Sequence, residues 1–310
     1  LGAVFKQMGR VNESLLPMQE SVDLSPKDAE AHSNLGVTLQ ELGRLEEAEA
    51  SYRRAIALKP DSAEAHSNLG VTLQELGRLE EAEASYRQAI ALKPDYAEAH
   101  NNLGNTLKEL GRLDDAEASY RQAIALKPDS AEAHSNLGNT LKELGRLDDA
   151  GASYRQAIAL KPDSAEAHSN LGNTLKELGR LDDAETSCRK AIALKPDYAD
   201  AHNNLGNTLL GLSRLDEAEA SHRKAIALKS DYAEAHNNLG NTLLGLSRLD
   251  EAEASYRKAI ALKSDYAEAH LNLCEFLEKT NAIDKLLDVL EEARSKTSNM
   301  EADFRYYETL

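Results

Sequence analysis

From Ala29 onward, the chain repeats itself every 34 residues. Two successive copies, Ala97–Ser130 and Ala131–Ser164, differ only at Ser135 and Gly151. A fixed period of this length is typical of a solenoid, in which each repeat packs only on its neighbours. A chain of 310 residues would ordinarily suggest about two globular domains. We expect instead one elongated array whose core lengthens with each repeat.

The boundaries of the copies predict four segments. Residues 1–28 form a partial N-terminal repeat, and residues 29–266 form seven full repeats. Residues 267–294 form a degenerate final repeat, and residues 295–310 are the start of a further helix or a junction to a missing domain. The chain begins inside a repeat with Leu1 rather than Met. We therefore expect it to be a piece of a longer protein.

One repeat, Ala97–Ser130, predicts two antiparallel helices. The apolar residues of its first half have the spacing of one helix face, and they are Ala99, Leu103, Leu107 and Leu110. Gly111 favours the left-handed backbone that ends a helix. A second helix is expected from about Asp114 until Pro128, which cannot continue it. The fold predicted from the residues is therefore all-α, with each helix of about 20 Å at 1.5 Å per residue.

Side chains at the ends and contacts of these helices support the same prediction. Asp129 is expected to cap the next first helix, with Glu132 completing a capping box. Gly104, Ala116 and Ala123 are small, so we expect the two helix axes to approach closely at these residues.

The same repeat resembles the tetratricopeptide repeat (TPR) family. Counted from Ala97 as position 1, eight residues fall at the family's signature positions, namely His100, Leu103, Gly104, Leu107, Ala116, Tyr120, Ala123 and Pro128. Six of the eight are of the usual type; His100 and Leu107 stand where the family often has Trp and Tyr. The units are similar to the repeat arms of O-linked N-acetylglucosamine transferases and related bacterial arrays. The resemblance implies a right-handed superhelix, an α-solenoid, with the first helix of each pair on its concave face.

Charge and composition restrict the partners that such an array can bind. The net charge is −17, and it is spread along the chain at about −2 per repeat. Nucleic acid or an anionic membrane would be repelled, so we expect neither as a partner. The two cysteines, Cys188 and Cys274, occupy different repeat positions, which argues against a disulfide and favours a reducing, cytoplasmic location. We find no signal peptide and no apolar run long enough for a membrane span.

Asparagine recurs on the expected exposed face of the first helices, which carries positions 2, 5, 6, 9, 12 and 13. Asparagine is a poor residue inside a helix, so its repetition requires an explanation. Position 6 is Asn in eight copies: Asn34, Asn68, Asn102, Asn136, Asn170, Asn204, Asn238 and Asn272. Position 9 is Asn in five: Asn105, Asn139, Asn173, Asn207 and Asn241.

A side-chain amide offers both a donor and an acceptor, so a row of amides can bind the backbone of an extended peptide whatever its sequence. The resemblance to the glycosyltransferase arms implies the same use. Solvated amides, or structural amides between repeats, are the alternative, because recent duplication copies a neutral Asn as faithfully as a useful one. We predict peptide binding by all thirteen asparagines.

The predicted function is a non-catalytic scaffold that binds an extended protein or peptide in the concave groove. Two alternatives remain open: a substrate-recruiting arm of a larger enzyme of glycosyltransferase or sulfotransferase type, and a module that self-associates through exposed terminal helices. Eight histidines recur at position 4, from His32 to His270, and they are expected to be packing residues rather than metal ligands. We find no catalytic residues, no metal site and no cofactor motif.

Overall fold

The computed structural model describes residues 2–282 and 285–290, and within them the chain is all-α. The predicted all-α fold class is confirmed. The chain divides into two compact units, Leu1–Leu160 and Lys161–Leu310, hereafter the N-terminal and the C-terminal unit. Segment 295–310, where the sequence predicts a further helix or a junction, lies outside the described residues.

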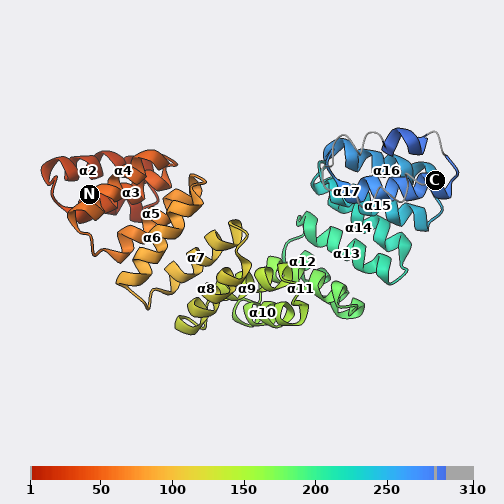
Figure 1. The fold of residues 1–310 in the computed structure, drawn as a ribbon, viewed down its shortest axis with the longest axis horizontal. Helices are drawn as coiled ribbons and strands as arrows, with labels where there is room; N and C mark the ends of the chain where they lie inside the picture. Colours follow the sequence, from red (N-terminus) through yellow and green to blue (C-terminus); the bar gives the residue numbers. More distant parts are fainter. Residues whose placement is uncertain (1, 283–284, 291–310) are drawn as a thin grey trace. The chain divides into compact units, whose positions relative to one another are not determined.

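The N-terminal unit contains ten helices within the described residues (Figure 1). They are α1 (Gly2–Gln7), α2 (Val11–Leu24), α3 (Ala29–Glu41), α4 (Leu45–Leu58), α5 (Ala63–Glu75), α6 (Leu79–Leu92), α7 (Ala97–Glu109), α8 (Leu113–Leu126), α9 (Ala131–Glu143) and α10 (Leu147–Leu160).

The C-terminal unit continues the same pattern in its described part. Its helices are α11 (Ala165–Glu177), α12 (Leu181–Leu194), α13 (Ala199–Gly211), α14 (Leu215–Leu228), α15 (Ala233–Gly245), α16 (Leu249–Leu262) and α17 (Ala267–Lys279). Residues 285–290 are also helical.

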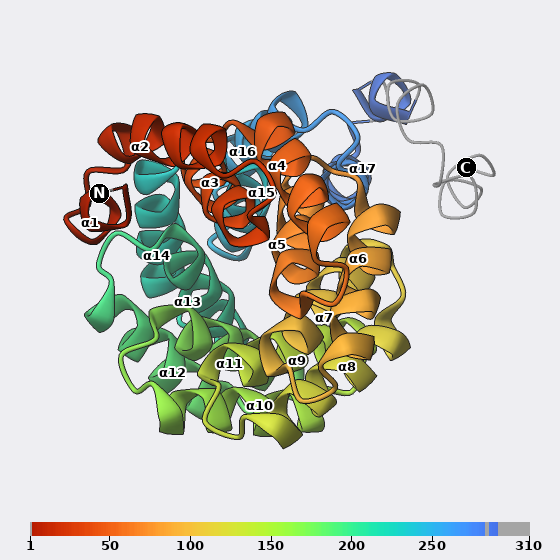
Figure 2. The same cartoon turned by 90° about the vertical axis from the view of Figure 1, so that its left-hand side faces the viewer.

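Each repeat therefore consists of a first helix (α3, α5 and the following odd-numbered helices) and a second helix (the even-numbered helix after it). Within each unit, every helix packs on the helix before it and the helix after it (Figure 2). First helices also contact the first helix of the next repeat, as α5 contacts α7 and α11 contacts α13. Second helices of successive repeats do not approach each other as closely. The first helices therefore lie on the inner side of the curve within each unit.

The core of each repeat is built around one tyrosine and one glycine. In the repeat of α7 and α8, Tyr120 is fully buried, as are Ala99 and Ala116. A Cβ atom on Gly104 would lie only 2.6 Å from Cε1 of Tyr120, so any side chain there would overlap the ring. The prediction that Gly104 has no room for a larger side chain is confirmed, because the Tyr120 ring fills the space beside it.

The turns within the repeats have the left-handed backbone that the glycines predict. Gly111 has φ of 74°. Ser213 and Ser247 replace this glycine in two repeats and hold φ of 60° and 59°. A residue with a Cβ in this conformation costs about 1 kcal/mol or more relative to glycine.

Replacing Ser213 with glycine should therefore raise the free energy of unfolding of the chain by about 1 kcal/mol. Urea denaturation followed by circular dichroism measures this change. Ser221→Gly is the matched control, because Ser221 lies inside α14, where glycine lowers helix stability. A loss of stability with Ser213→Gly would show that the serine side chain makes a contact that outweighs its backbone strain.

The predicted helix caps are wrong by one residue. The N-cap of α9 is Ser130, not Asp129, and the Ser130 hydroxyl accepts a hydrogen bond from the backbone N–H of Ala133 at 3.2 Å. Four first helices have tyrosine at this cap position and no side-chain cap bond: Tyr96, Tyr198, Tyr232 and Tyr266. The capping residue is therefore the one directly before the first helix and not the aspartate before it; in α3 that residue is Asp28, whose carboxylate accepts from the backbone N–H groups of Glu30 and Ala31.

The last described repeat ends with large apolar side chains. Phe276 is buried, and its ring centroid lies 6.2 Å from that of Tyr256. Leu286 and Val289 join the same apolar cluster. Cys274 takes the place of the repeated core glycine and is fully buried. None of the helices in the described part of the chain is both long and apolar enough to span a membrane.

Candidate functional site

The position 6 asparagines all lie on first helices, but their exposure differs along the chain. Asn34 is exposed, whereas Asn238 is buried, with 7% of its surface accessible. The other six are intermediate: Asn68, Asn102, Asn136, Asn170, Asn204 and Asn272. The expectation of one uniform exposed row is therefore wrong at Asn238.

Several of these amides donate to the preceding repeat. Nδ2 of Asn272 lies 2.9 Å from Oδ1 of Asn237, and Nδ2 of Asn238 lies 3.1 Å from Oδ1 of Asn203. Nδ2 of Asn204 similarly donates to the hydroxyl of Ser169 at 3.1 Å. In each pair the acceptor is the position 5 side chain of the repeat before. These amide N–H groups therefore join neighbouring first helices.

The N-terminal unit contains one bond of this kind and several unpartnered amides. Nδ2 of Asn136 donates to Oδ1 of Asn101 at 3.3 Å and to Oδ1 of Asn105 at 3.1 Å. Among the described residues, three position 6 side chains have no hydrogen bond within the chain: Asn34, Asn68 and Asn102. Asn170, in the C-terminal unit, does interact within the chain.

The position 9 asparagines are bound by the core tyrosine of their own repeat. The Tyr120 hydroxyl donates to Oδ1 of Asn105 at 2.7 Å. The same bond joins Tyr154 to Asn139 at 2.7 Å and Tyr256 to Asn241 at 2.8 Å. These three amides supply the acceptor for a hydroxyl on a buried tyrosine. Their first role is structural.

Asn173 and Asn207 differ from the other position 9 asparagines. Their repeats have Cys188 and His222 in place of the core tyrosine. Neither side chain reaches the amide, and neither Asn173 nor Asn207 has a side-chain hydrogen bond among the described residues. Both ring nitrogens of His222 are buried without a partner.

Where position 9 is valine, the tyrosine bonds to position 12 instead. The Tyr52 hydroxyl donates to Oε1 of Gln40 at 3.2 Å, in the repeat with Val37. The repeat with Val71 uses Gln74 in the same way. This exchange is visible in the sequence, because glutamine stands at position 12 only in the two repeats with valine at position 9. That pairing could have indicated the structural role of the position 9 amides.

Other side chains on the first-helix face also link neighbouring repeats. Nε2 of Gln40 donates to Oε1 of Glu75 at 3.0 Å. In the next part of the N-terminal unit, Nζ of Lys108 lies 2.9 Å from Oε1 of Glu143. Leu210 takes this position in the C-terminal unit and packs against an apolar cluster. At position 12, the contact with the neighbouring repeat thus changes from polar at Gln40 and Lys108 to apolar at Leu210.

The recurrent histidines are structural, as the sequence predicts. Nε2 of His100 lies 3.1 Å from the carbonyl oxygen of Pro94, in the turn before its helix. The carbonyl can only accept, so Nε2 carries the proton and the histidine holds the turn against the helix. Equivalent contacts are made by His32, His66, His134, His168, His202, His236 and His270.

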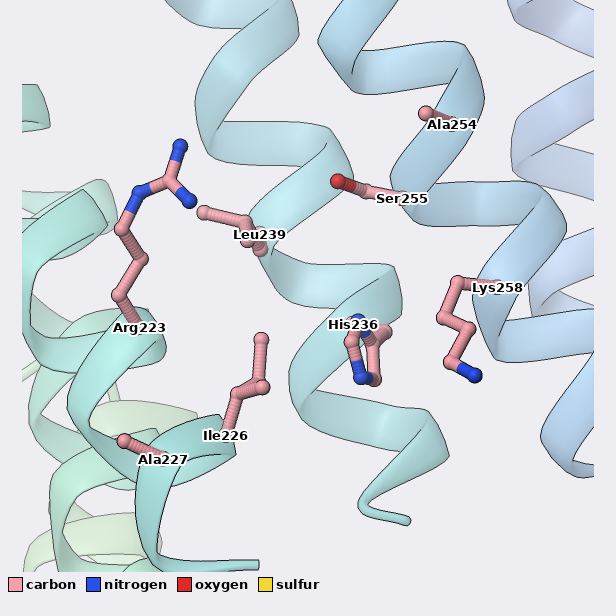
Figure 3. A pocket seen from close by; sticks show the side chains of 8 residues that line it. All are labelled: Arg223, Ile226, Ala227, His236, Leu239, Ala254, Ser255 and Lys258. Carbon is pink, nitrogen blue, oxygen red and sulfur yellow. The ribbon is translucent and has the colours of Figure 1, made fainter. Parts of the chain in front are cut away.

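Shallow pockets recur beside these histidines on the second-helix side. Figure 3 shows one of about 380 Å³, between α14, α15 and α16. Ile226 and Leu239 form its apolar wall, His236 lies at its centre, and Lys258 lies at its edge. The same pocket recurs in the C-terminal unit beside His202 and in the N-terminal unit beside His66, His100 and His134.

Burial holds three further titratable side chains in their neutral forms at neutral pH. Burial raises the pKa of the Cys188 thiol to about 12, and burial likewise raises the pKa of Cys274 to about 12. Burial lowers the pKa of His222 to about 4. The described residues contain no group of three or more His, Cys, Asp or Glu side chains that could hold a metal ion.

Comparison with solved structures identifies relatives with the same helix-pair fold. The chain is similar to the crystal structure of the APC/C hetero-tetramer Cut9–Hcn1, with a TM-score of 0.66 and 17% identity, over 86% of this chain and 52% of that chain. It thus spans about half the length of that relative. It is also similar to YrrB, described as a TPR protein with an unusual peptide-binding site, with a TM-score of 0.52 and 25% identity, over 59% of this chain and 95% of that chain.

Models of repeat families match nearly the whole chain. TPR repeat models match residues 39–77, 73–111, 104–145 and 138–179. Tetratricopeptide repeat models match residues 18–50, 163–231, 197–265 and 237–298. No curated protein matches the chain in sequence. These matches and the repeated helix pairs together show that the chain belongs to the tetratricopeptide repeat family.

Proposed function

We propose that this chain is a non-catalytic scaffold that binds an extended polypeptide segment along its row of first helices. Fold relatives support the general role of a protein-interaction scaffold, and one of them, YrrB, is described as having a peptide-binding site. The finer claim, that side-chain amides hold the backbone of the bound segment, is supported by amides that have no side-chain hydrogen bond among the described residues.

The observation that carries the proposal is the set of unpartnered position 6 amides on the inner side of the N-terminal unit. Asn68 and Asn102 lie on neighbouring first helices, are partly exposed and have no side-chain hydrogen bond among the described residues. Each can donate to and accept from one peptide group. An asparagine without a hydrogen-bond partner lowers helix stability relative to alanine, because alanine has the higher helix propensity.

The other amides are proposed to have a double role. Where Nδ2 donates to the preceding repeat and the residue is partly exposed, as in Asn204 and Asn272, no described residue donates to the side-chain oxygen, which can accept a hydrogen bond from a peptide. These residues would add single hydrogen bonds to a peptide. The recruiting-arm and self-association alternatives stay predictions. The cytoplasmic location also belongs to the proposal, and it rests on two buried cysteines that form no disulfide.

The test is the double variant Asn68→Ala, Asn102→Ala. The probe is the strongest binder selected from a random library of 12-residue peptides displayed on phage, made synthetically with a fluorescent label. Loss of two amide pairs should weaken binding at least tenfold, at about 1 kcal/mol per hydrogen bond. Fluorescence anisotropy measures the affinity.

The matched control is Asn238→Ala. It removes the bond to Asn203 and should lower the free energy of unfolding by about 1 kcal/mol, whereas the double variant should leave it unchanged or raise it. Equal affinity of the double variant and the unaltered protein would reject backbone recognition by these amides.

A further inference from the structure

Two repeats that are almost identical in sequence differ in how they use their position 9 amide. Residues 199–232 and 233–266 differ only by Asp200 against Glu234 and by His222 against Tyr256. In the second copy, the Tyr256 hydroxyl donates to Oδ1 of Asn241 at 2.8 Å. In the first copy, the equivalent Asn207 has no side-chain hydrogen bond among the described residues. The exchange of one core residue therefore decides whether the amide is bound.

His222 occupies the tyrosine site without replacing its hydrogen bond. It is fully buried, and a Cβ on Gly206 would lie 2.5 Å from its Cε1 atom, so the ring packs against the glycine as the tyrosines do. Its two ring nitrogens have no hydrogen-bond partner in the described part of the chain. The imidazole lacks the hydroxyl that extends from the phenol toward the first helix.

The repeat before it has the same property for a different reason. Cys188 is fully buried, and its Sγ would lie 2.5 Å from a Cβ on Gly172. The cysteine side chain is shorter than a phenol, so Asn173 also lacks the bond that tyrosine makes elsewhere. Asn173 and Asn207 are thus successive position 9 amides, on α11 and α13, and within residues 2–282 and 285–290 neither their donor nor their acceptor groups form a hydrogen bond.

We propose that Asn173 and Asn207 are the principal backbone-binding pair of this array, and that Cys188 and His222 make them available by omitting the tyrosine hydroxyl. This inference rests on the proposed function. Cys188 and His222 act only through the asparagines, so they are positioning residues. In the tyrosine repeats, a peptide would have to share the amide oxygen with the phenol.

The spacing of the pair specifies the ligand. Neighbouring packed helices lie about 8–10 Å apart. An extended chain rises about 3.3 Å per residue, so one repeat corresponds to about three residues. The ligand is therefore an extended segment with unsubstituted peptide groups at residues i and i+3. A proline or an N-methylated residue at either point removes the donor that Oδ1 of the asparagine would accept from.

The first arm of the experiment restores the hydroxyl. The double variant Cys188→Tyr, His222→Tyr should bind the library-selected probe peptide at least tenfold more weakly, while circular dichroism shows an intact helical fold. The double variant Asn173→Ala, Asn207→Ala tests the same amides without changing the core, and it should lose affinity to a similar extent.

The second arm of the experiment makes a further position 9 amide available for peptide binding. Tyr256→His should free Asn241 and strengthen binding by at least threefold, because a third amide joins the pair. Asn241→Ala in the otherwise unaltered protein is the control, and its affinity should stay within twofold. N-methylation of the probe, one residue at a time, should weaken binding most at two residues that are three apart, and this pattern should vanish in the tyrosine variant.

The outcomes separate this inference from the proposed function. Unchanged affinity of both double variants, with loss of affinity in Asn68→Ala, Asn102→Ala, would overturn the special role of Asn173 and Asn207 and leave the scaffold function in place. If no first-helix variant changes affinity, or if no peptide is selected, both the inference and the backbone-binding proposal are wrong.

Discussion

Replacing His222 with tyrosine should raise the free energy of unfolding of the chain by about 2 kcal/mol at pH 7. The histidine leaves two buried ring nitrogens without hydrogen bonds, and a buried unpaired polar group costs about 1–3 kcal/mol. The tyrosine hydroxyl would instead donate a hydrogen bond to Asn207, as the Tyr256 hydroxyl donates to Asn241 in the nearly identical following repeat. Gly206 already provides the space for a ring.

The stabilisation by this substitution should grow as the pH falls. Burial lowers the pKa of His222 from 6.5 to about 4, so the folded protein keeps the imidazole neutral while the unfolded chain takes up a proton below pH 6.5. The contribution of neutral His222 to the free energy of unfolding is therefore fully present above pH 6.5, and it is lost as the pH falls toward 4. At pH 5, the loss caused by His222 amounts to about 2 kcal/mol, at 1.36 kcal/mol per pH unit.

Urea denaturation of both proteins at pH 7.5 and pH 5 measures this difference. Paired carboxylates also titrate in acid, for example Glu83, whose pKa the Arg87 and Arg112 side chains hold below its usual range. They occur in both proteins, so the difference between the variants isolates His222. A difference that does not change with pH would show that His222 is accessible to solvent protons in the folded state.

Replacing Gly104 with valine should lower the free energy of unfolding by about 3 kcal/mol. The first atom of any side chain at this position would lie 2.6 Å from Cε1 of Tyr120. The tyrosine cannot move away, because it is fully buried and its hydroxyl is bound to Asn105. The two helices would have to separate, which also weakens the contacts with both neighbouring repeats.

If overlap with Tyr120 causes the destabilisation, the effect of a substitution at Gly104 on the free energy of unfolding should change sign when Tyr120 is removed. Gly104→Ala alone should be destabilising, whereas the same change in a Tyr120→Ala background should be stabilising by about 1 kcal/mol, because alanine favours the helix and partly fills the cavity. Hydrogen exchange in α7 and α8 locates the effect within the array. Destabilisation in both backgrounds would mean that Gly104 is required by something other than the phenol.

Much of the fold follows from the sequence because its signals are local or strictly periodic. The apolar spacing within Ala97–Ser130 and the turn at Gly111 act over one or two helical turns, and the 34-residue period repeats these local signals along the chain. The second helix begins at Leu113, one residue before the expected Asp114. The cap prediction failed at Asp129 because two neighbouring polar residues can serve, and only the backbone geometry selects Ser130.

The candidate site was only partly predictable. The sequence by itself determined that the chain folds into stacked helix pairs with asparagines on one face of the first helices. Only the tertiary structure decided which of these amides form hydrogen bonds within the chain. Asn238 donates to Asn203 in the preceding repeat, and Asn241 accepts from Tyr256, whereas Asn207 has no side-chain hydrogen bond among the described residues. The reason is that such bonds join residues 15 to 35 positions apart, so they depend on helix packing rather than on local spacing.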